Sequence, residues 1–151
     1  ISTNTVFPTT AFLMTFIIIR QYIGGYHAKT HLGCMSILAV VLCCFAILTR
    51  CIPDQYEIWI SMLSVVSSII LILRFAPVEH PNKPLSDNEK LRLRKRGIIS
   101  MFIVFVLAFV MVIFTETRRY GMYISLGQFT ASTAMLCEII KHKRMNLNHE
   151  D

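Results

Sequence analysis

The sequence predicts an all-α, polytopic integral membrane protein with about five membrane helices. Hydrophobic residues make up 54% of the 151 residues and charged residues only 16%, whereas about a quarter of a soluble domain is charged. The apolar residues gather in five long runs, and the basic residues gather at the ends of these runs. We expect the membrane helices at residues 6–23, 34–48, 56–75, 97–114 and 122–140. Residues 1–151 then form one integral membrane domain.

Local signals support each run in turn. Pro8 stands near the start of the first run, where a helix tolerates proline, and Pro53 marks the turn after the second run. Tyr56 and Trp59 open the third run, at the usual position of interfacial aromatic residues. The fifth run is less apolar, and its small residues predict a helix packed closely against other helices: Ser125, Gly127, Thr130, Ala131, Ser132 and Ala134.

The polar segment 76–96 precedes the fourth run and has two parts. Its first part, 76–84, contains three prolines, which exclude a regular helix. Residues 86–89 read Ser-Asp-Asn-Glu and resemble a capping box, so a short basic helical stretch is expected to begin there. The basic residues of this stretch are Lys90, Arg92, Arg94, Lys95 and Arg96.

The distribution of lysine and arginine predicts the orientation in the membrane. We assign the segments 24–33, 76–96 and 141–151 to one side, together with Arg20 and Arg74. That side then holds all of the 15 basic residues except Arg50, Arg118 and Arg119. The positive-inside rule makes it the cytoplasmic side. The net charge of +6 is therefore explained by membrane orientation, and no nucleic-acid partner is expected.

The cysteine spacings and the amino-terminal residues exclude some other classes of protein and segment. Five cysteines with these spacings fit neither a disulfide framework nor a zinc knuckle. Cys43, Cys44 and Cys137 lie in apolar runs and are expected to be small buried structural residues. Cys51, at a helix end, could have either role, although nothing nearby activates it. Only Cys34 has polar neighbours. The chain begins at Ile1 and shows no signal-peptide pattern, so we expect an amino-terminal part of the protein to be missing.

A glycine-rich polar stretch, 20–34, brings two histidines close to Cys34. A cysteine with a nearby histidine is the minimum for a thiol nucleophile, because only the thiolate attacks and a base must form it. At the start of the second helix, the unpaired N–H groups and the helix dipole should lower the thiol pKa and could hold an oxyanion. On a continuous helix His31 would be its neighbour, whereas His27 would lie roughly 10 Å away along the axis. Spacing alone therefore slightly favours His31 as the base, and His27 requires a bend at the glycines.

Three other interpretations compete with catalysis. An isolated His–Cys pair in a polar loop most often has no chemical role. A zinc site from His27, His31 and Cys34 has suitable His-x-x-x-His spacing, but Ala28 stands where a zinc protease needs glutamate. We therefore expect no metal and no cofactor. A non-catalytic membrane peptide transporter or sensor should carry buried charges in the middle of its helices, and these runs have almost none.

Two segments resemble the accessory gene regulator protein B (AgrB-like) family, which comprises membrane cysteine endopeptidases of Gram-positive quorum sensing. They are Arg20-x-x-x-Gly24-Gly25-x-His27-Ala28-x-Thr30-x-x-x-Cys34 and Ala76-Pro-Val-Glu-His-Pro-Asn-Lys-Pro84. The resemblance implies that His27, rather than His31, pairs with Cys34 as the catalytic dyad. It also implies a bend, so that His27 and Cys34 do not lie on one unbroken helix.

The same resemblance suggests supporting residues. Arg20 and Gly25 match family motif positions, and Arg20 is expected to orient a substrate carboxylate or the loop itself. Gln21 and Ser36 are candidates for a third catalytic residue, although no motif identifies either of them.

The resemblance further implies a substrate and a place in the cell. Family members cleave the carboxy-terminal part from an autoinducer precursor peptide (AgrD-like) and close a thiolactone or lactone ring through an acyl-enzyme. The active site would lie at the cytoplasmic face of a bacterial cell membrane, among membrane lipids. The small-residue helix faces are compatible with a homodimer. The residues expected to dock the acidic precursor tail, or the anionic inner leaflet, are Lys83, Lys90, Arg92 and Lys95.

Overall fold

The computed structural model describes residues 3–23, 31–49, 51–76, 78 and 86–147. This part of the chain is helical, with no strand among the described residues, which confirms the all-α fold class. The long helices are α1 (Thr3–Ile23), α2 (His31–Leu48), α3 (Glu57–Phe75), α4 (Asp87–Ile113) and α5 (Arg118–Leu147). Short 3₁₀ turns, η1 (Asp54–Tyr56) and η2 (Thr115–Thr117), precede α3 and α5.

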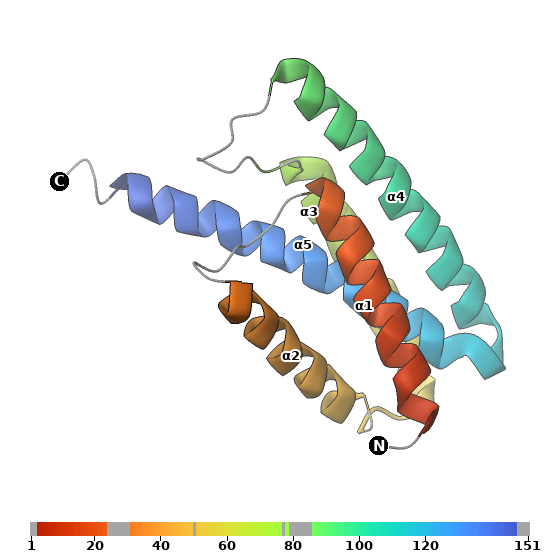
Figure 1. The fold of residues 1–151 in the computed structure, drawn as a ribbon. Helices are drawn as coiled ribbons and strands as arrows, with labels where there is room; N and C mark the ends of the chain where they lie inside the picture. Colours follow the sequence, from red (N-terminus) through yellow and green to blue (C-terminus); the bar gives the residue numbers. More distant parts are fainter. Residues whose placement is uncertain (1–2, 24–30, 50, 77, 79–85, 148–151) are drawn as a thin grey trace.

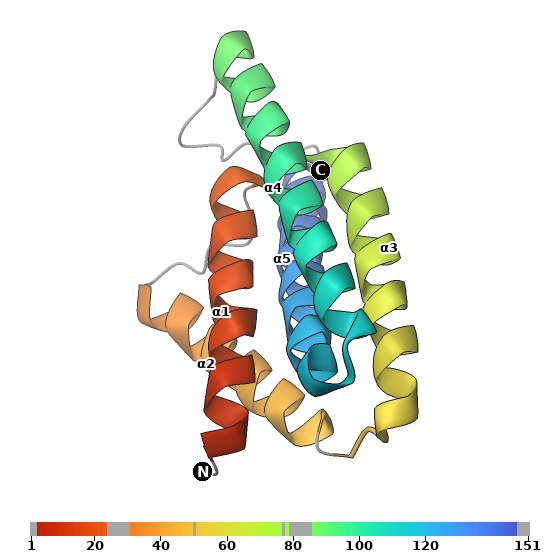
Figure 2. The ribbon, with the colours of Figure 1, turned by 90° about the vertical axis from the view of Figure 1, so that its right-hand side faces the viewer.

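Helix α5 is the centre of the fold. It packs against α1, α3 and α4, while α2 lies apart and rests mainly beside α1 (Figures 1 and 2). The eight consecutive residues 121–128 of α5 are all buried, so this part of the helix is enclosed on every side. The prediction that the fifth run packs closely against other helices is confirmed. Helix α2 adds an aromatic contact, since the rings of Phe45 and Phe12 are 5.5 Å apart.

Two glycines allow α5 to approach its neighbours closely. A Cβ atom on Gly127 would lie 2.6 Å from the carbonyl oxygen of Phe12 in α1. A Cβ atom on Gly121 would lie 2.9 Å from the carbonyl oxygen of Ala108 in α4. Both separations are too short for any side chain. Glycine at these positions brings the helix backbones together, as is common where helices pack inside a membrane.

Hydroxyl pairs join α3 to α5 inside the bundle. The Oγ atoms of Ser61 and Ser125 are 2.6 Å apart, and those of Ser68 and Ser132 are 3.0 Å apart. Both pairs have the same separation of 64 residues, so α3 and α5 run in the same direction in a fixed register. Interhelical hydrogen bonds of this kind contribute about 0.6 kcal/mol each inside a membrane protein.

Two helical stretches are long and apolar enough to cross a bilayer, Asp54–Phe75 and Asp87–Ile113. Only 28% of the most apolar 18 residues of each stretch are buried, whereas the core helix of a soluble protein would be mostly buried. Large apolar side chains cover their outer faces, among them Leu63, Ile70, Phe102 and Ile103. The apolar parts of α1 and α2, Phe7–Ile23 and Leu38–Ile47, are shorter. The described residues thus contain two candidate membrane-spanning helices by length and composition, and the expected total of about five stays a prediction.

The predicted capping box begins α4. The Oγ atom of Ser86 accepts a hydrogen bond from the N–H of Glu89 at 3.4 Å, and the N–H of Ser86 donates to the Glu89 carboxylate at 3.0 Å. Both bonds satisfy backbone or side-chain groups that a free helix start would leave to water. The sequence therefore predicted the start of this helix correctly.

Other helix ends extend beyond the predicted apolar runs. Helix α2 begins at His31, three residues before the predicted start. Helix α4 joins the basic stretch and the fourth run without a break, and α5 extends at both ends into the predicted polar loop and tail. Lysine, arginine and glutamate are good helix formers, and basic residues favour the C-terminal end of a helix. Polar residues can therefore continue a helix that hydropathy alone would end.

Candidate active site

The candidate active site lies where α1 ends and α2 begins. Helix α1 ends at Ile23 and α2 begins at His31. Gly25 and His27 fall in the segment 24–30, outside the described residues. The structure therefore defines the two helix ends on either side of residues 24–30, which we call the His27 loop.

Cys34 is the fourth residue of α2, so its backbone lies in the first turn. The first four N–H groups of a helix have no intrahelical partner, and the positive end of the helix dipole lies there. The expected thiolate and oxyanion environment stays a prediction, because the side chain of Cys34 is outside the described part of the chain. His31 lies three residues earlier in the same helix, on the same face by register. The predicted bend between His27 and Cys34 stays a prediction, because His27 is outside the described residues.

Arg20 lies in the last turn of α1, three residues before its end at Ile23. Its guanidinium carbon is 5.4 Å from the centroid of the Phe16 ring, a separation that allows a cation–π interaction. Its side chain is half-buried, whereas that of Gln21 is exposed. Ser36 is exposed on α2, two residues after Cys34. Residues two apart on a helix do not face each other, which argues against Ser36 as a direct partner of Cys34.

Val78, from the second motif segment (76–84), contacts the last residue of α1, Ile23. The N–H of Val78 donates a hydrogen bond to the carbonyl oxygen of Ile23 at 3.2 Å. On α4, Gly97 faces the same turn, since its Cβ would lie 3.4 Å from Cγ2 of Ile23. The segments around 24–33 and 76–96 therefore leave from the same end, as the predicted topology requires. The sequence analysis did not identify Val78, because a backbone contact between distant segments leaves no sequence pattern.

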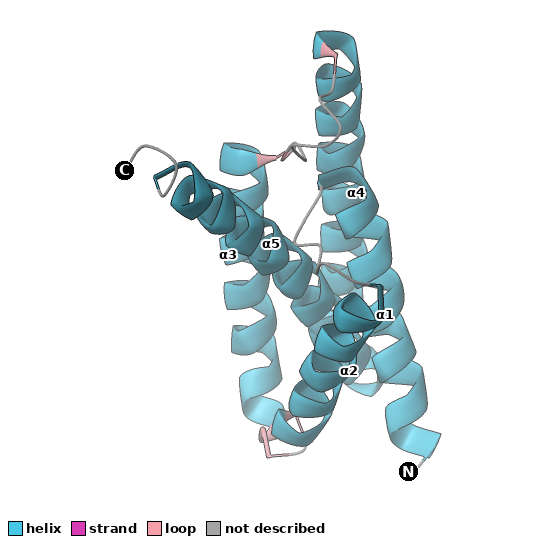
Figure 3. Cartoon of the chain, turned by 60° about the vertical axis from the view of Figure 1, so that its left-hand side comes forward, coloured by secondary structure: helices cyan, strands magenta, loops and turns pink. Residues whose placement is uncertain are grey.

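The basic residues of α4 lie at this same end. We call Lys90, Arg92, Arg94, Lys95 and Arg96 the basic turns. They occupy the first turns of α4, which project beyond the neighbouring helices (Figures 2 and 3). Lys90 lies 3.9 Å from Asp87, and Arg94 donates to the carbonyl oxygen of Leu73 at 3.5 Å. The expected docking residue Lys83 is outside the described residues. The basic turns thus form an exposed cationic surface at the end of the bundle where α1 ends.

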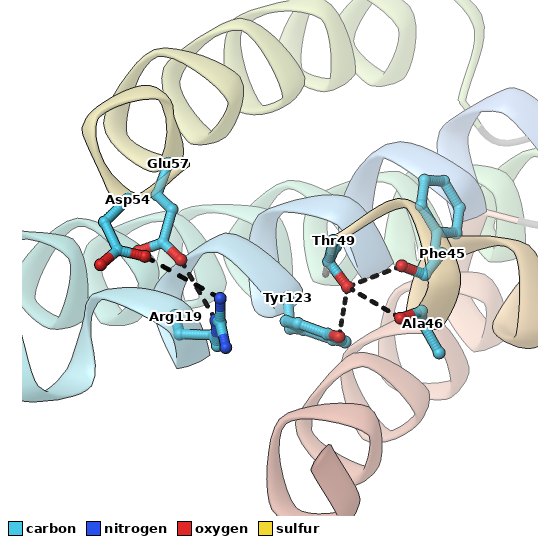
Figure 4. Close-up of polar contacts among 7 residues, drawn as sticks. All are labelled: Phe45, Ala46, Thr49, Asp54, Glu57, Arg119 and Tyr123. Atoms are coloured by element: carbon cyan, nitrogen blue, oxygen red, sulfur yellow. Dashed lines mark hydrogen bonds and ion pairs between the residues drawn. The ribbon is translucent and has the colours of Figure 1, made fainter. Parts of the chain in front are cut away.

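A second polar cluster, which the sequence analysis did not identify, occupies the opposite end of the bundle (Figure 4). Glu57 is buried, and its carboxylate accepts a hydrogen bond from Nε of Arg119 at 3.2 Å. Beside this pair, the hydroxyl oxygens of Thr49 and Tyr123 are 2.5 Å apart. A cavity of about 230 Å³ lies here, lined by Asp54, Glu57, Thr115, Arg118 and Arg119. An ionisable residue at the first turn of an apolar helix, as Glu57 is, is the sequence signal that could have indicated this cluster.

The sequence matches the Accessory gene regulator B family over residues 1–140. The chain belongs to this family. The predicted resemblance is thereby confirmed, and the matched range contains both motif segments and the basic turns. The family consists of accessory gene regulator proteins of quorum sensing.

Curated relatives of this accessory gene regulator B family member are distant and longer. Over 134 residues it is 24% identical to a putative AgrB-like protein of Clostridium perfringens (strain SM101 / Type A), covering 85% of this chain and 59% of that protein. Over 97 residues it is 27% identical to accessory gene regulator protein B of Staphylococcus intermedius, covering 63% of this chain and 50% of that protein. The chain thus spans between half and three fifths of the length of these relatives. No solved structure shows significant similarity to it.

Proposed function

We propose that this chain carries the catalytic site of a membrane cysteine endopeptidase that processes an autoinducer precursor peptide for quorum sensing. Family membership over residues 1–140 carries the proposal, because this range includes His27 and Cys34. The fold supports it in one respect: the end of α1, Val78 and the basic turns of α4 lie at one end of the bundle.

The first chemical step is cleavage of the precursor. His27 takes the proton from the thiol of Cys34, and the thiolate sulfur bonds to the scissile carbonyl carbon. In this proposal, the N–H groups in the first turn of α2 stabilise the oxyanion that forms. The carbon–nitrogen bond then breaks, and His27 returns the proton to the departing amine. The carboxy-terminal fragment leaves, and the remaining peptide is held on Cys34 as a thioester.

The second step closes the ring. A thiol within the precursor attacks the thioester carbonyl and displaces Cys34, so one thioester replaces another at little energetic cost. A hydroxyl as the attacking group would give a lactone. Water competes for the acyl-enzyme. A site at the membrane surface that folds the peptide back on itself favours the internal attack, because proximity lowers the barrier by several kcal/mol.

Charge and topology define the remaining parts of the proposal. The site faces the cytoplasm of a multi-pass membrane protein, on the side that carries most of the lysines and arginines. The basic turns, with Lys83, dock the acidic tail of the precursor. This arrangement would bring the scissile bond to the first turn of α2, which carries Cys34.

The experiment compares full-length variants in membranes with a cognate precursor, using mass spectrometry of the products. Cys34→Ala is expected to abolish cleavage, and His27→Ala to reduce it at least ~100-fold, as loss of a general base does. His31→Ala is the control and is expected to keep most of the activity. Cleavage retained in either dyad variant contradicts the proposed dyad. A wild-type protein that binds the precursor without cleaving it supports the alternative, a non-catalytic transporter or sensor.

A further inference from the structure

We propose that residues 76–78, called the strap below, position the His27 loop by holding the end of α1 through the backbone of Val78. The inference rests on the proposed function, in which His27 activates Cys34. It assigns a role to the proline-rich motif segment, for which the sequence analysis found no chemistry.

The contact itself satisfies a buried backbone group. The last carbonyl groups of a helix have no intrahelical donor, and Ile23 is the last residue of α1. Ile23 is fully buried, so its carbonyl oxygen would be costly to leave unpaired. The N–H of Val78, from a segment 55 residues away, donates to this oxygen at 3.2 Å. The strap thus caps α1 at the residue from which the His27 loop departs.

The two described residues of the strap, Ala76 and Val78, are both held by contacts with the bundle. The N–H of Ala76 donates to the carbonyl oxygen of Ile72 at 3.0 Å, and Ala76 is buried with an extended backbone (φ −80°, ψ 147°). An extended conformation is favoured before proline, and residue 77 is proline. Proline has no N–H, so Val78 supplies the first free donor after Ala76. The side chain of Val78 packs against the hydrophobic core.

Helix α4 fixes the same turn from another side. The Cβ position of Gly97 lies 3.4 Å from Cγ2 of Ile23 and 3.6 Å from Cβ of Tyr22. His27 follows Ile23 by four residues in the sequence, and four residues reach about 14 Å at most. The position of Ile23 therefore limits where His27 can lie. A displacement of about 1 Å at a catalytic group can cost ~100-fold in rate.

A matched pair of variants separates the backbone bond from side-chain packing. In the full-length protein, Val78→Pro removes the N–H and keeps an aliphatic side chain, whereas Val78→Ala keeps the N–H and removes bulk. We expect Val78→Pro to lower kcat for precursor cleavage at least ~10-fold with KM within about twofold. Val78→Ala is expected to stay close to the wild type. Membrane levels and thermal unfolding of each variant are measured alongside.

A second readout needs no precursor and reports on His27 directly. The alkylation rate of Cys34 by iodoacetamide at neutral pH, followed by mass spectrometry, measures how readily the thiolate forms. His27→Ala sets the rate without the base. Val78→Pro is expected to fall to that rate, whereas Val78→Ala should keep the wild-type rate. A strap that only stabilised the fold would lower the unfolding temperature and leave the alkylation rate of the folded protein unchanged.

The outcomes distinguish the strap from the proposed function. Wild-type kcat and alkylation in folded Val78→Pro overturn the strap, and so do equal losses in Val78→Pro and Val78→Ala. If Val78→Pro does not fold, Pro77→Gly decides, since it keeps both hydrogen-bonding groups and loosens the chain between them. A partial loss of kcat supports the strap, and an unchanged kcat overturns it. Absence of cleavage by the wild type, by contrast, contradicts the proposed function.

Discussion

Gly127→Ala probes the close approach of α5 to α1, on which the position of the candidate site depends. The added Cβ would lie 2.6 Å from the carbonyl oxygen of Phe12 and 3.2 Å from Cβ of Thr15. The first neighbour is backbone and cannot rotate away. To reach the 3.4 Å of an ordinary contact, α1 would have to move by about 0.8 Å.

Two opposing effects determine how Gly127→Ala changes the free energy of unfolding. Alanine gains about 0.5–1 kcal/mol over glycine inside a helix, because glycine loses more conformational entropy on folding. Overpacking costs about 1–3 kcal/mol, so we expect Gly127→Ala to be destabilised by about 1 kcal/mol. Gly97→Ala is the matched control. Its Cβ would lie 3.4 Å from the side chain of Ile23, so only the gain of about 0.5–1 kcal/mol should remain.

Thermal unfolding of the two variants, followed by circular dichroism in detergent, measures the difference. About 2 kcal/mol between them corresponds to roughly 4–8 °C in Tm for a chain of this size. Precursor cleavage should also fall in Gly127→Ala, because α1 ends beside the His27 loop. A Tm for Gly127→Ala equal to or above that of Gly97→Ala would refute the close approach of the two backbones.

Two further predictions concern the charged residues at the two ends of the bundle. The first variant reverses charge in the basic turns by combining Lys90→Glu, Arg92→Glu and Lys95→Glu. It is expected to lower precursor cleavage several-fold, because it weakens docking of the precursor. The alkylation rate of the Cys34 thiol should not change, because the dyad is intact. Lys143→Glu, at an exposed position near the end of α5, is the control, and unchanged cleavage in the triple variant contradicts docking. Arg119→Ala should destabilise the protein by about 1–3 kcal/mol in thermal unfolding, because the Glu57 carboxylate, 4% exposed, loses its charged partner. Adding Glu57→Gln should restore most of the loss, and a wild-type Tm for Arg119→Ala would show that the pair does not stabilise the fold.

The fold class and several element boundaries could be predicted because they depend on local properties of the chain. Long apolar runs indicated the helices, and the small polar residues of the fifth run indicated a helix enclosed by others. The capping box at Ser86 involves residues three apart, so it could also be predicted. Hydropathy misplaced the starts of α2 and α5, because a helix can begin with residues that are not apolar: α2 begins at His31, and α5 at Arg118 and Arg119.

The candidate site, too, could be predicted from the sequence only in part. Cys34 in the first turn of α2 was close to the expected position, and the family motif indicated the dyad without any structure. Tertiary structure alone revealed the hydrogen bond between Val78 and Ile23, the ion pair of Glu57 with Arg119, and the serine pairs of α3 and α5. Each joins residues more than 50 positions apart. Such contacts depend on how the helices pack against one another, and the packing depends on small residues such as Gly127 whose effect is visible only when the neighbouring helix is in place.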